Sequence, residues 1–169
     1  MASHGWRNDE SPFGGEAVGA NPTDRGKGGT KRQLLTEGAG IPLAVEVDGA
    51  NRHDMKMAEA TLANVQAVPC DPNEEQNLSL DKGFDYPEVG ELARDYGYAP
   101  HIRSRGEEKR DLERIPGYRA RRWVVERTHS WMNRFRRLLI RWEKKKVNFL
   151  NMIYLACAVI TFRAAGVLG

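Results

Sequence analysis

Hydrophobic and polar residues repeat with recognisable periods over most of the chain after residue 30. Segments 31–36 and 41–47 have the pattern of strands and flank a glycine turn, which predicts a β-hairpin. Short apolar runs predict two further strands, and apolar residues three or four positions apart predict helices. The further strands are 78–80 and 98–102, and the helices are 54–65, 87–95, 121–145 and 148–164. This order of elements predicts an α/β fold with a mixed sheet and flanking helices. Asp54 is the expected cap of the first helix.

The clearest predicted helix is the amphipathic segment 121–145. Apolar or small side chains recur along it at intervals of 4, 3, 4, 3 and 4, which places them on one face. This seam consists of Val124, Thr128, Trp131, Phe135, Leu138 and Trp142. We expect the seam, including its two tryptophans, to pack in the core.

The first 25 residues are rich in glycine and lack apolar periodicity, so we expect a disordered or loop-like lead-in. Residues 26–169 are then expected to form one domain, in keeping with a chain of 169 residues. No signal-like segment is visible at the N-terminus, and Cys70 and Cys157 lie far apart in the sequence. Both observations favour a cytoplasmic protein without disulfides.

Charge is distributed unevenly behind a net charge of +3. Residues 1–100 carry a net charge of −8, whereas residues 101–146 carry +10. A positive block of this size favours a polyanionic partner, and nucleic acid is the obvious one. The block is also compatible with a solvated helix whose charges serve only solubility.

Two carboxylates occupy positions where chemistry is often found. Asp81 directly follows segment 78–80, at the C-terminal end of an expected strand, where open α/β sheets bind ligands. Glu126 lies opposite the seam of the long helix, on a cationic and polar face that suits a metal ion beside a phosphate backbone. Each also has a plain interpretation, since Asp81 fits a turn residue and Glu126 fits a surface ion pair with Arg122 or Arg137.

The basic stretch around Glu126 supplies the candidate DNA contacts. Its side chains would bind phosphates and raise affinity without reading sequence. Trp123 lies on the polar side of the helix, where it could stack on an unpaired base or pack at the helix edge. The candidate DNA-binding residues are Arg122, Arg127, Asn133, Arg134, Arg137, Arg141 and Lys144.

Several sequence blocks, in the same order over about residues 12–164, resemble bacterial insertion-sequence transposases with a DDE catalytic domain. The blocks are 21–31 (NPTDRGKGGTK), 40–43 (GIPL), 50–55 (ANRHDM), 80–85 (LDKGFD), 121–131 (RRWVVERTHSW) and 133–138 (NRFRRL). The resemblance implies an RNase H-like fold. It also implies a catalytic site in which Asp81 and Glu126 are the second and third acidic ligands of two Mg²⁺ ions. Arg122 matches the family's arginine, whereas Arg119 stands where the family has a tyrosine.

Departures from the family pattern predict an impaired copy. The resemblance implies a first catalytic aspartate in an Asp-Gly-Ser-like block on the first strand, upstream of the segment that is PFGGE at 12–16 here. No Asp-Gly precedes that segment, and Asp9 is close to it in a stretch without strand character. The family's N-terminal DNA-binding region is also missing. We therefore expect a truncated catalytic domain without its first strand.

The resulting hypothesis is DNA transposition by metal-dependent strand cleavage and strand transfer, with this copy inactive or impaired. Its expected partners are double-stranded DNA, both transposon ends and target, and a second copy of the chain; no membrane is expected. One alternative is a non-catalytic DNA-binding remnant, whose DNA binding would not change on Asp81→Asn. Another is a protein-interaction domain whose charge asymmetry drives self-association.

Overall fold

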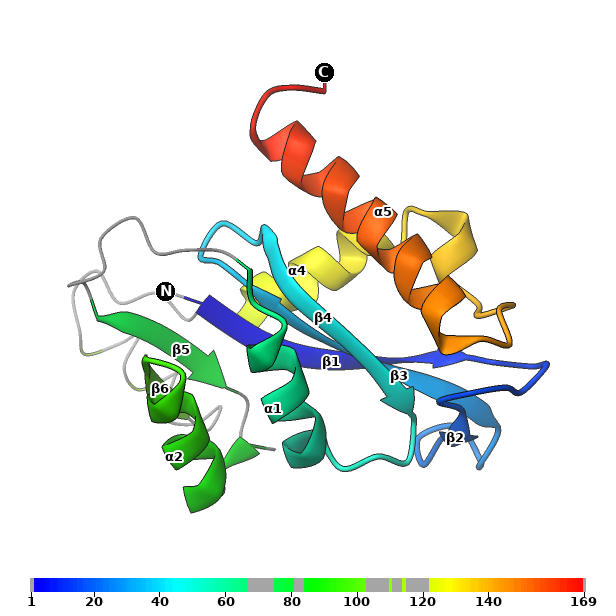
Figure 1. Ribbon diagram of the computed structural model, residues 1–169, viewed down its shortest axis with the longest axis horizontal. Helices are drawn as coiled ribbons and strands as arrows, with labels where there is room; N and C mark the ends of the chain where they lie inside the picture. The colour runs from blue at the N-terminus through cyan, green and yellow to red at the C-terminus, as the bar shows by residue number, and fades with distance from the viewer. Residues whose placement is uncertain are drawn as a thin grey trace.

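The computed structural model describes residues 2–66, 75–80, 84–102, 110, 114 and 122–168. Within them, a six-stranded sheet has helices on both faces (Figure 1). The strands are β1 (Ala2–Glu10), β2 (Gly19–Ala20), β3 (Gly28–Thr36), β4 (Pro42–Gly49), β5 (Gln76–Leu80) and β6 (Tyr98–Ile102). The helices are α1 (Asp54–Ala63), α2 (Pro87–Asp95), α4 (Arg122–Met132), the 3-10 helix η2 (Arg136–Leu138) and α5 (Lys146–Ala164). The predicted mixed α/β architecture is confirmed.

Strand β1 lies in the middle of the sheet and joins an antiparallel part to a parallel part. The strand order is β2-β3-β1-β5-β6, and β4 pairs with β3. β1 is antiparallel to β3 from Ser3 to Glu10, and it is parallel to β5 at Ala2 and Ser3. β1 therefore links the two parts of the sheet, paired with β3 along most of its length and with β5 at its start.

Two apolar clusters pack on opposite faces of the sheet. Adjacent residues Leu34 and Leu35, both 0% exposed, belong to different clusters, as the two-residue period of a strand requires. The Leu35 cluster contains buried residues of α1 and α2, and the Leu34 cluster contains buried residues of α4 and α5. The predicted site residue Glu126 belongs to α4 and therefore lies on this second side of the sheet.

The expectation of a loop-like lead-in over residues 1–25, with the first strand missing, differs from the structure. Residues 2–10 form β1, the central strand. This strand is not evident from the sequence, because it buries polar groups in place of a row of apolar side chains. Asp9 is 2% exposed, and it forms an ion pair with Arg32, which is 0% exposed. A strand of this kind lacks the alternation that identifies strands in a sequence.

The single helix expected over 121–145 is also wrong, since α4 ends at Met132. Beyond η2 the chain becomes extended, and Ile140 forms a parallel bridge with Glu10. The N–H of Arg141 donates to the Glu10 carbonyl at 2.8 Å. Pairing with the end of β1 therefore replaces helical hydrogen bonds in this segment.

The seam predicted for that helix is only partly in the core. Trp142 is 42% exposed, because it follows the extended segment and not a helix. Trp131 and Phe135 are partly buried and pack on the α4 side of the sheet. The buried members are Val124, Thr128 and Leu138.

The remaining predicted elements agree with the structure. The hairpin is formed by β3 and β4, and α2 and β6 have the predicted bounds. Helix α1 begins at Asp54, but its N-cap is His53, whose Nδ1 accepts a hydrogen bond from the N–H of Met55 at 3.4 Å. The Asp54 carboxylate instead binds Lys31 at 2.6 Å, which ties α1 to β3.

Helix α5 is long and apolar enough to cross a membrane by length and composition alone. Four of its side chains are nevertheless buried in the protein, in the spacing of a core-facing stripe: Phe149, Ile153, Ala156 and Ile160. The helix passes along the α4 side of the sheet and carries the chain towards the C-terminus (Figure 1).

Candidate active site and nucleic-acid interface

The parallel strands β1 and β5 bring the first residues of the chain beside the predicted catalytic segment. Ala2 is paired with Leu78 and Ser3 with Ser79. Leu80 is the last described residue of β5, and Asp81, which follows it, lies outside the described residues. Because both strands run in the same direction, the C-terminal end of β5 adjoins the part of β1 just after Ser3.

Helix α4 crosses β1 at Gly5, in close contact. A Cβ atom on Gly5 would lie 2.7 Å from a methyl carbon of Val125, so a larger residue at this position would require the Val125 side chain to shift. Glu126 follows Val125 on the helix and is exposed to solvent. The crossing therefore sets Glu126 near the stretch of β1 that adjoins the end of β5.

Of the two predicted metal ligands, the structure places one. Glu126 stands on α4 as expected, whereas the position of Asp81 and the convergence of the two carboxylates stay predictions. Arg122 is the first residue of α4, and its side chain is outside the described part. In the described ranges, no three His, Cys, Asp or Glu side chains gather as a metal site would require. The described residues alone therefore do not make a magnesium site.

Two histidines are buried near Gly5, on different elements. His4 is 3% exposed and packs edge-on against Phe84, with ring centroids 4.7 Å apart. His129, on α4, is 6% exposed. Among the described residues, none forms a hydrogen bond with the ring nitrogens of His4. Burial lowers the pKa of His4 to about 3, and burial together with the charges of Arg32 and Arg7 lowers the pKa of His129 to about 3. Both rings are thus neutral at pH 7.

Asp9, an acidic residue of β1 upstream of the PFGGE segment, takes part in an internal ion pair. Its carboxylate lies 3.5 Å from the Arg32 guanidinium, and both side chains are 0% exposed. Arg7 lies at the same distance, with a side chain that is 43% exposed. Burial raises the pKa of Asp9 more than the two arginines lower it. Asp9 also lies four residues beyond Gly5, about 13 Å along the strand at 3.3 Å per residue.

Some of the predicted DNA-binding residues are exposed to solvent, and others are bonded to groups within the protein. Exposed members are Arg134, Arg137 and Lys144, although Arg137 also binds Glu143 at 2.9 Å. Arg141 is 1% exposed, and its guanidinium donates to Ala17, Thr30, Glu143 and Lys144. Asn133 is half-buried and accepts from Arg32 at 3.5 Å. Arg141 therefore has a structural role inside the protein. The exposed residues Arg134, Arg137 and Lys144 are the ones that can contact phosphates.

Arg127 lies between two tryptophans on the surface of α4. Its guanidinium carbon is 4.5 Å from the centre of the Trp123 ring and 4.8 Å from that of Trp131. It also donates to the Ala39 carbonyl in the turn between β3 and β4. These contacts hold the ring of Trp123, which is 50% exposed, against the helix.

The transposase DDE domain matches residues 3–161 of the chain. The chain belongs to the transposase DDE domain family. It is 34% identical over 159 residues to a protein described as a transposase for insertion sequence element IS402 of Burkholderia cepacia, a match that covers 90% of this chain and 72% of the relative.

The chain is also similar to a solved structure, the catalytic core domain of BIV integrase. The TM-score is 0.42 at 13% identity, and the similarity covers 78% of this chain and 66% of the integrase chain. The chain thus spans slightly less than two thirds of that structure. The expected RNase H-like architecture of the DDE family agrees with the mixed sheet and flanking helices described above.

Sequence reasoning missed the polar residues of the sheet that surround the site. The sequence gives no indication that Gly5 and His4 lie beside the site, because β1 lacks the alternation of a strand and the spacing of the histidines does not suggest metal ligands. Arg32 could have been noticed, since it is a charged residue inside the correctly predicted segment 31–36. A charge in a strand interior indicates either an exposed face or a buried partner, and here the partner is Asp9.

Acidification from pH 7 to pH 5 is expected to destabilise the fold by about 2 kcal/mol for each buried histidine. The pKa of both histidines is about 3 in the folded state against 6.5 in the unfolded state. Between these values the unfolded chain binds more protons, so stability falls as pH falls. Asp9 opposes part of this loss, because its pKa is raised by folding.

Urea unfolding at the two pH values measures this difference. An unfolding midpoint that is equal or higher at pH 5 would contradict the neutral, buried state of the histidines.

Proposed function

We propose that the chain carries the DNA cleavage and strand-transfer centre of a transposase in an impaired form. The observation that supports this most is the crossing of α4 over β1, which presents exposed Glu126 near the end of β5, the strand that Asp81 follows. Asp81 and Glu126 would share a divalent ion, with Mg²⁺ the expected one. Carboxylate oxygens are the ligands this ion prefers. When bound, Mg²⁺ would activate a water or DNA 3′-hydroxyl and stabilise the leaving oxygen.

The chain's own residues would hold and orient the DNA. Exposed Arg134, Arg137 and Lys144 follow Glu126 in the sequence and would bind phosphates of transposon ends and target DNA. Cationic contacts of this kind make binding strongly salt-dependent, with affinity for duplex DNA falling as salt rises. A cytoplasmic location and a homodimer remain part of this proposal.

The impairment is assigned to residue 5. Ser3 of β1 is paired with Ser79 of β5. Gly5 follows Ser3 by two residues in the sequence, and Asp81 follows Ser79 by two residues. A carboxylate at position 5 would stand beside Val125, the residue before Glu126 on α4, but glycine supplies none. The acidic residues of β1 are Asp9, which is buried against Arg32, and Glu10 at the far end of the strand. Neither is placed to complete the ligand set.

A nicking assay with Mg²⁺ and DNA carrying the element's ends tests both parts of the proposal. The chain is expected to nick no faster than its Glu126→Gln variant. The double substitution Gly5→Asp with Val125→Ala is expected to gain nicking. Val125→Ala removes the two methyl carbons that would lie 2.7 and 3.4 Å from the new Cβ atom and leaves the Val125 Cβ at 3.7 Å. Adding Glu126→Gln to the double variant should abolish the gain.

The control is Val125→Ala alone, which should remain inactive, with folding checked by circular dichroism. Glu126-dependent nicking by the unmodified chain would contradict the impairment. No gain in a folded double variant would contradict the role given to position 5.

A further inference from the structure

We propose that Phe13 and Trp142 form a platform on which unpaired bases of single-stranded DNA stack. The inference rests on the proposed action on DNA and adds a second contact region to it. The two rings lie 5.3 Å apart with an angle of 51° between their planes. Phe13 is 60% exposed and Trp142 is 42% exposed, so both offer ring surface to solvent.

The platform is held by a rigid junction between two segments far apart in the sequence. The N–H of Glu16 donates to the Lys144 carbonyl at 2.9 Å, and the N–H of Lys146 donates to the Glu16 carboxylate at 2.9 Å. Arg141, 1% exposed, donates from its guanidinium to the Ala17 carbonyl at 3.0 Å. These bonds fix the segment that carries Phe13 against the segment that carries Trp142.

Gly15 permits the close approach within this junction. Its φ is +122°, and a Cβ atom at this position would overlap the Lys144 backbone. The PFGGE segment, which the proposed cleavage chemistry does not use, thus has a structural role, because it positions Phe13 beside Trp142. Exposed aromatic rings on a rigid support lose little conformational entropy when a base stacks on them.

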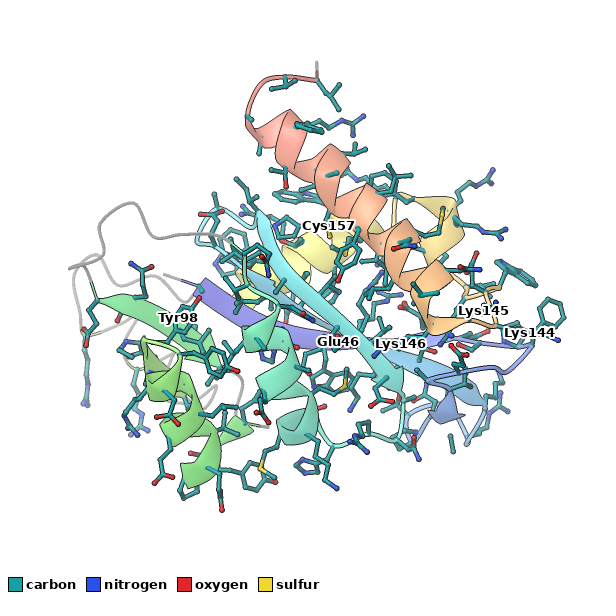
Figure 2. The ribbon with its side chains drawn as sticks, viewed as in Figure 1. Glu46, Tyr98, Lys144, Lys145, Lys146 and Cys157 are labelled. Carbon is teal, nitrogen blue, oxygen red and sulfur yellow. The ribbon has the colours of Figure 1, made fainter. Side chains whose placement is uncertain are left out.

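Two lysines give the platform a charge that suits DNA. Lys144 and Lys145 are exposed, and neither forms an ion pair with a described residue. The other nearby cations are occupied, since Arg137 binds Glu143 and Lys146 binds Glu46. In Figure 2, Lys144 and Lys145 lie at the start of α5 on the outer edge of the molecule, and Lys146 lies towards Glu46. Aromatic faces beside unpaired lysines are the usual elements of a single-strand site.

The location fits a strand that extends from the cleavage site. The platform follows the bridge between Glu10 and Ile140, and Glu10 lies five residues beyond Gly5 on β1. That separation is about 17 Å at 3.3 Å per residue. A DNA strand crossing α4 near Glu126 would therefore reach the platform within several nucleotides.

The test is the binding of a fluorescein-labelled oligonucleotide of thymidines by anisotropy, with EDTA present. Trp142→Ala and Phe13→Ala are each expected to raise Kd roughly 5- to 150-fold, which corresponds to the loss of about 1–3 kcal/mol for one stacked base. Trp142→Phe should retain most of the affinity, whereas Trp142→Leu, which is apolar but cannot stack in the same way, should not. Lys144→Gln with Lys145→Gln should reduce the salt slope by about 1.4, two single-strand phosphate contacts.

Phe162→Ala is the matched control, because Phe162 is 50% exposed on α5, outside the platform. It should leave Kd unchanged. Thermal unfolding of each variant separates loss of binding from loss of fold. For any variant that does not fold, the unmodified chain is measured with 2-aminopurine in the oligonucleotide, whose fluorescence should be quenched by stacking.

Unchanged Kd in folded Trp142→Ala and Phe13→Ala, or an equal loss of affinity for blunt duplex DNA, would overturn the inference. Absence of 2-aminopurine quenching would do the same. Because the assay excludes metal, binding of the oligonucleotide can persist when the nicking assay fails. Failure of the platform and failure of the proposed cleavage chemistry are therefore distinguishable.

Discussion

Replacement of Asp9 by alanine is expected to lower the free energy of unfolding by about 3–5 kcal/mol. The substitution leaves the Arg32 guanidinium, 0% exposed, without its anionic partner at 3.5 Å. A buried charge without a partner costs far more than a lost surface pair. Urea unfolding at pH 7 measures the loss.

Two controls give this prediction its specificity. Asp24→Ala removes a surface pair with Lys27 at 3.3 Å and should change stability by less than about 1 kcal/mol. Asp9→Leu combined with Arg32→Met removes both charges and should recover most of the stability lost in Asp9→Ala. A cost below about 1 kcal/mol for Asp9→Ala would mean that Asp9 is not part of a buried pair.

Replacement of His4 by leucine is expected to stabilise the protein by about 1–3 kcal/mol at pH 7. The ring of His4 is 3% exposed, and no described residue bonds to its nitrogens. Its surroundings are apolar and include Ala58, Leu62, Leu78, Leu80, Phe84, Val89 and Ala93. Leucine has a similar volume and removes two buried polar atoms that lack partners.

The same variant should gain a larger advantage at pH 5. Burial lowers the pKa of His4 to about 3, so the unmodified chain loses stability as pH falls below 6.5 and the leucine variant lacks this loss. His4→Gln retains the polar burial and should not stabilise. Thermal and urea unfolding at both pH values measure the difference in stability. Destabilisation by His4→Leu at pH 7 would contradict the prediction, because it would mean that the His4 ring has a hydrogen-bond partner.

The extent to which the sequence predicts this fold depends on how each element is buried. β4 and α2 were predictable because each buries apolar residues at the expected spacing, Val45 and Val47 in β4 and Val89 and Ala93 in α2. β1 was not, because its row on the α4 side contains Gly5, Arg7 and Asp9. It is held by backbone pairing along β3, by shorter pairing with β5 and by an ion pair between Asp9 and Arg32 of β3, and a local sequence pattern shows none of these contacts.

The segment after α4 shows a second limit of sequence patterns. Phe135, Leu138 and Trp142 have helical spacing, yet the chain is extended at Ile140, where it pairs with Glu10. That contact joins residues 130 positions apart and can overcome local helix propensity. The same limit applies to the candidate site. Glu126 was predictable from the polar face of a single helix, whereas the contact between Gly5 and Val125 joins two distant segments and is evident only from the three-dimensional structure.

The proposed chemistry requires Asp81 and Glu126 to share one divalent ion, and iron-mediated cleavage of the chain tests this most directly. Fe²⁺ bound in place of Mg²⁺ generates hydroxyl radicals that cut the nearby backbone, and mass spectrometry locates the cuts. We expect cuts near both residue 81 and residue 126, suppressed by excess Mg²⁺ and lost in Asp81→Asn as well as in Glu126→Gln. Cuts near only one of the two residues, or cuts that persist at one when the other is replaced, would contradict a shared ion.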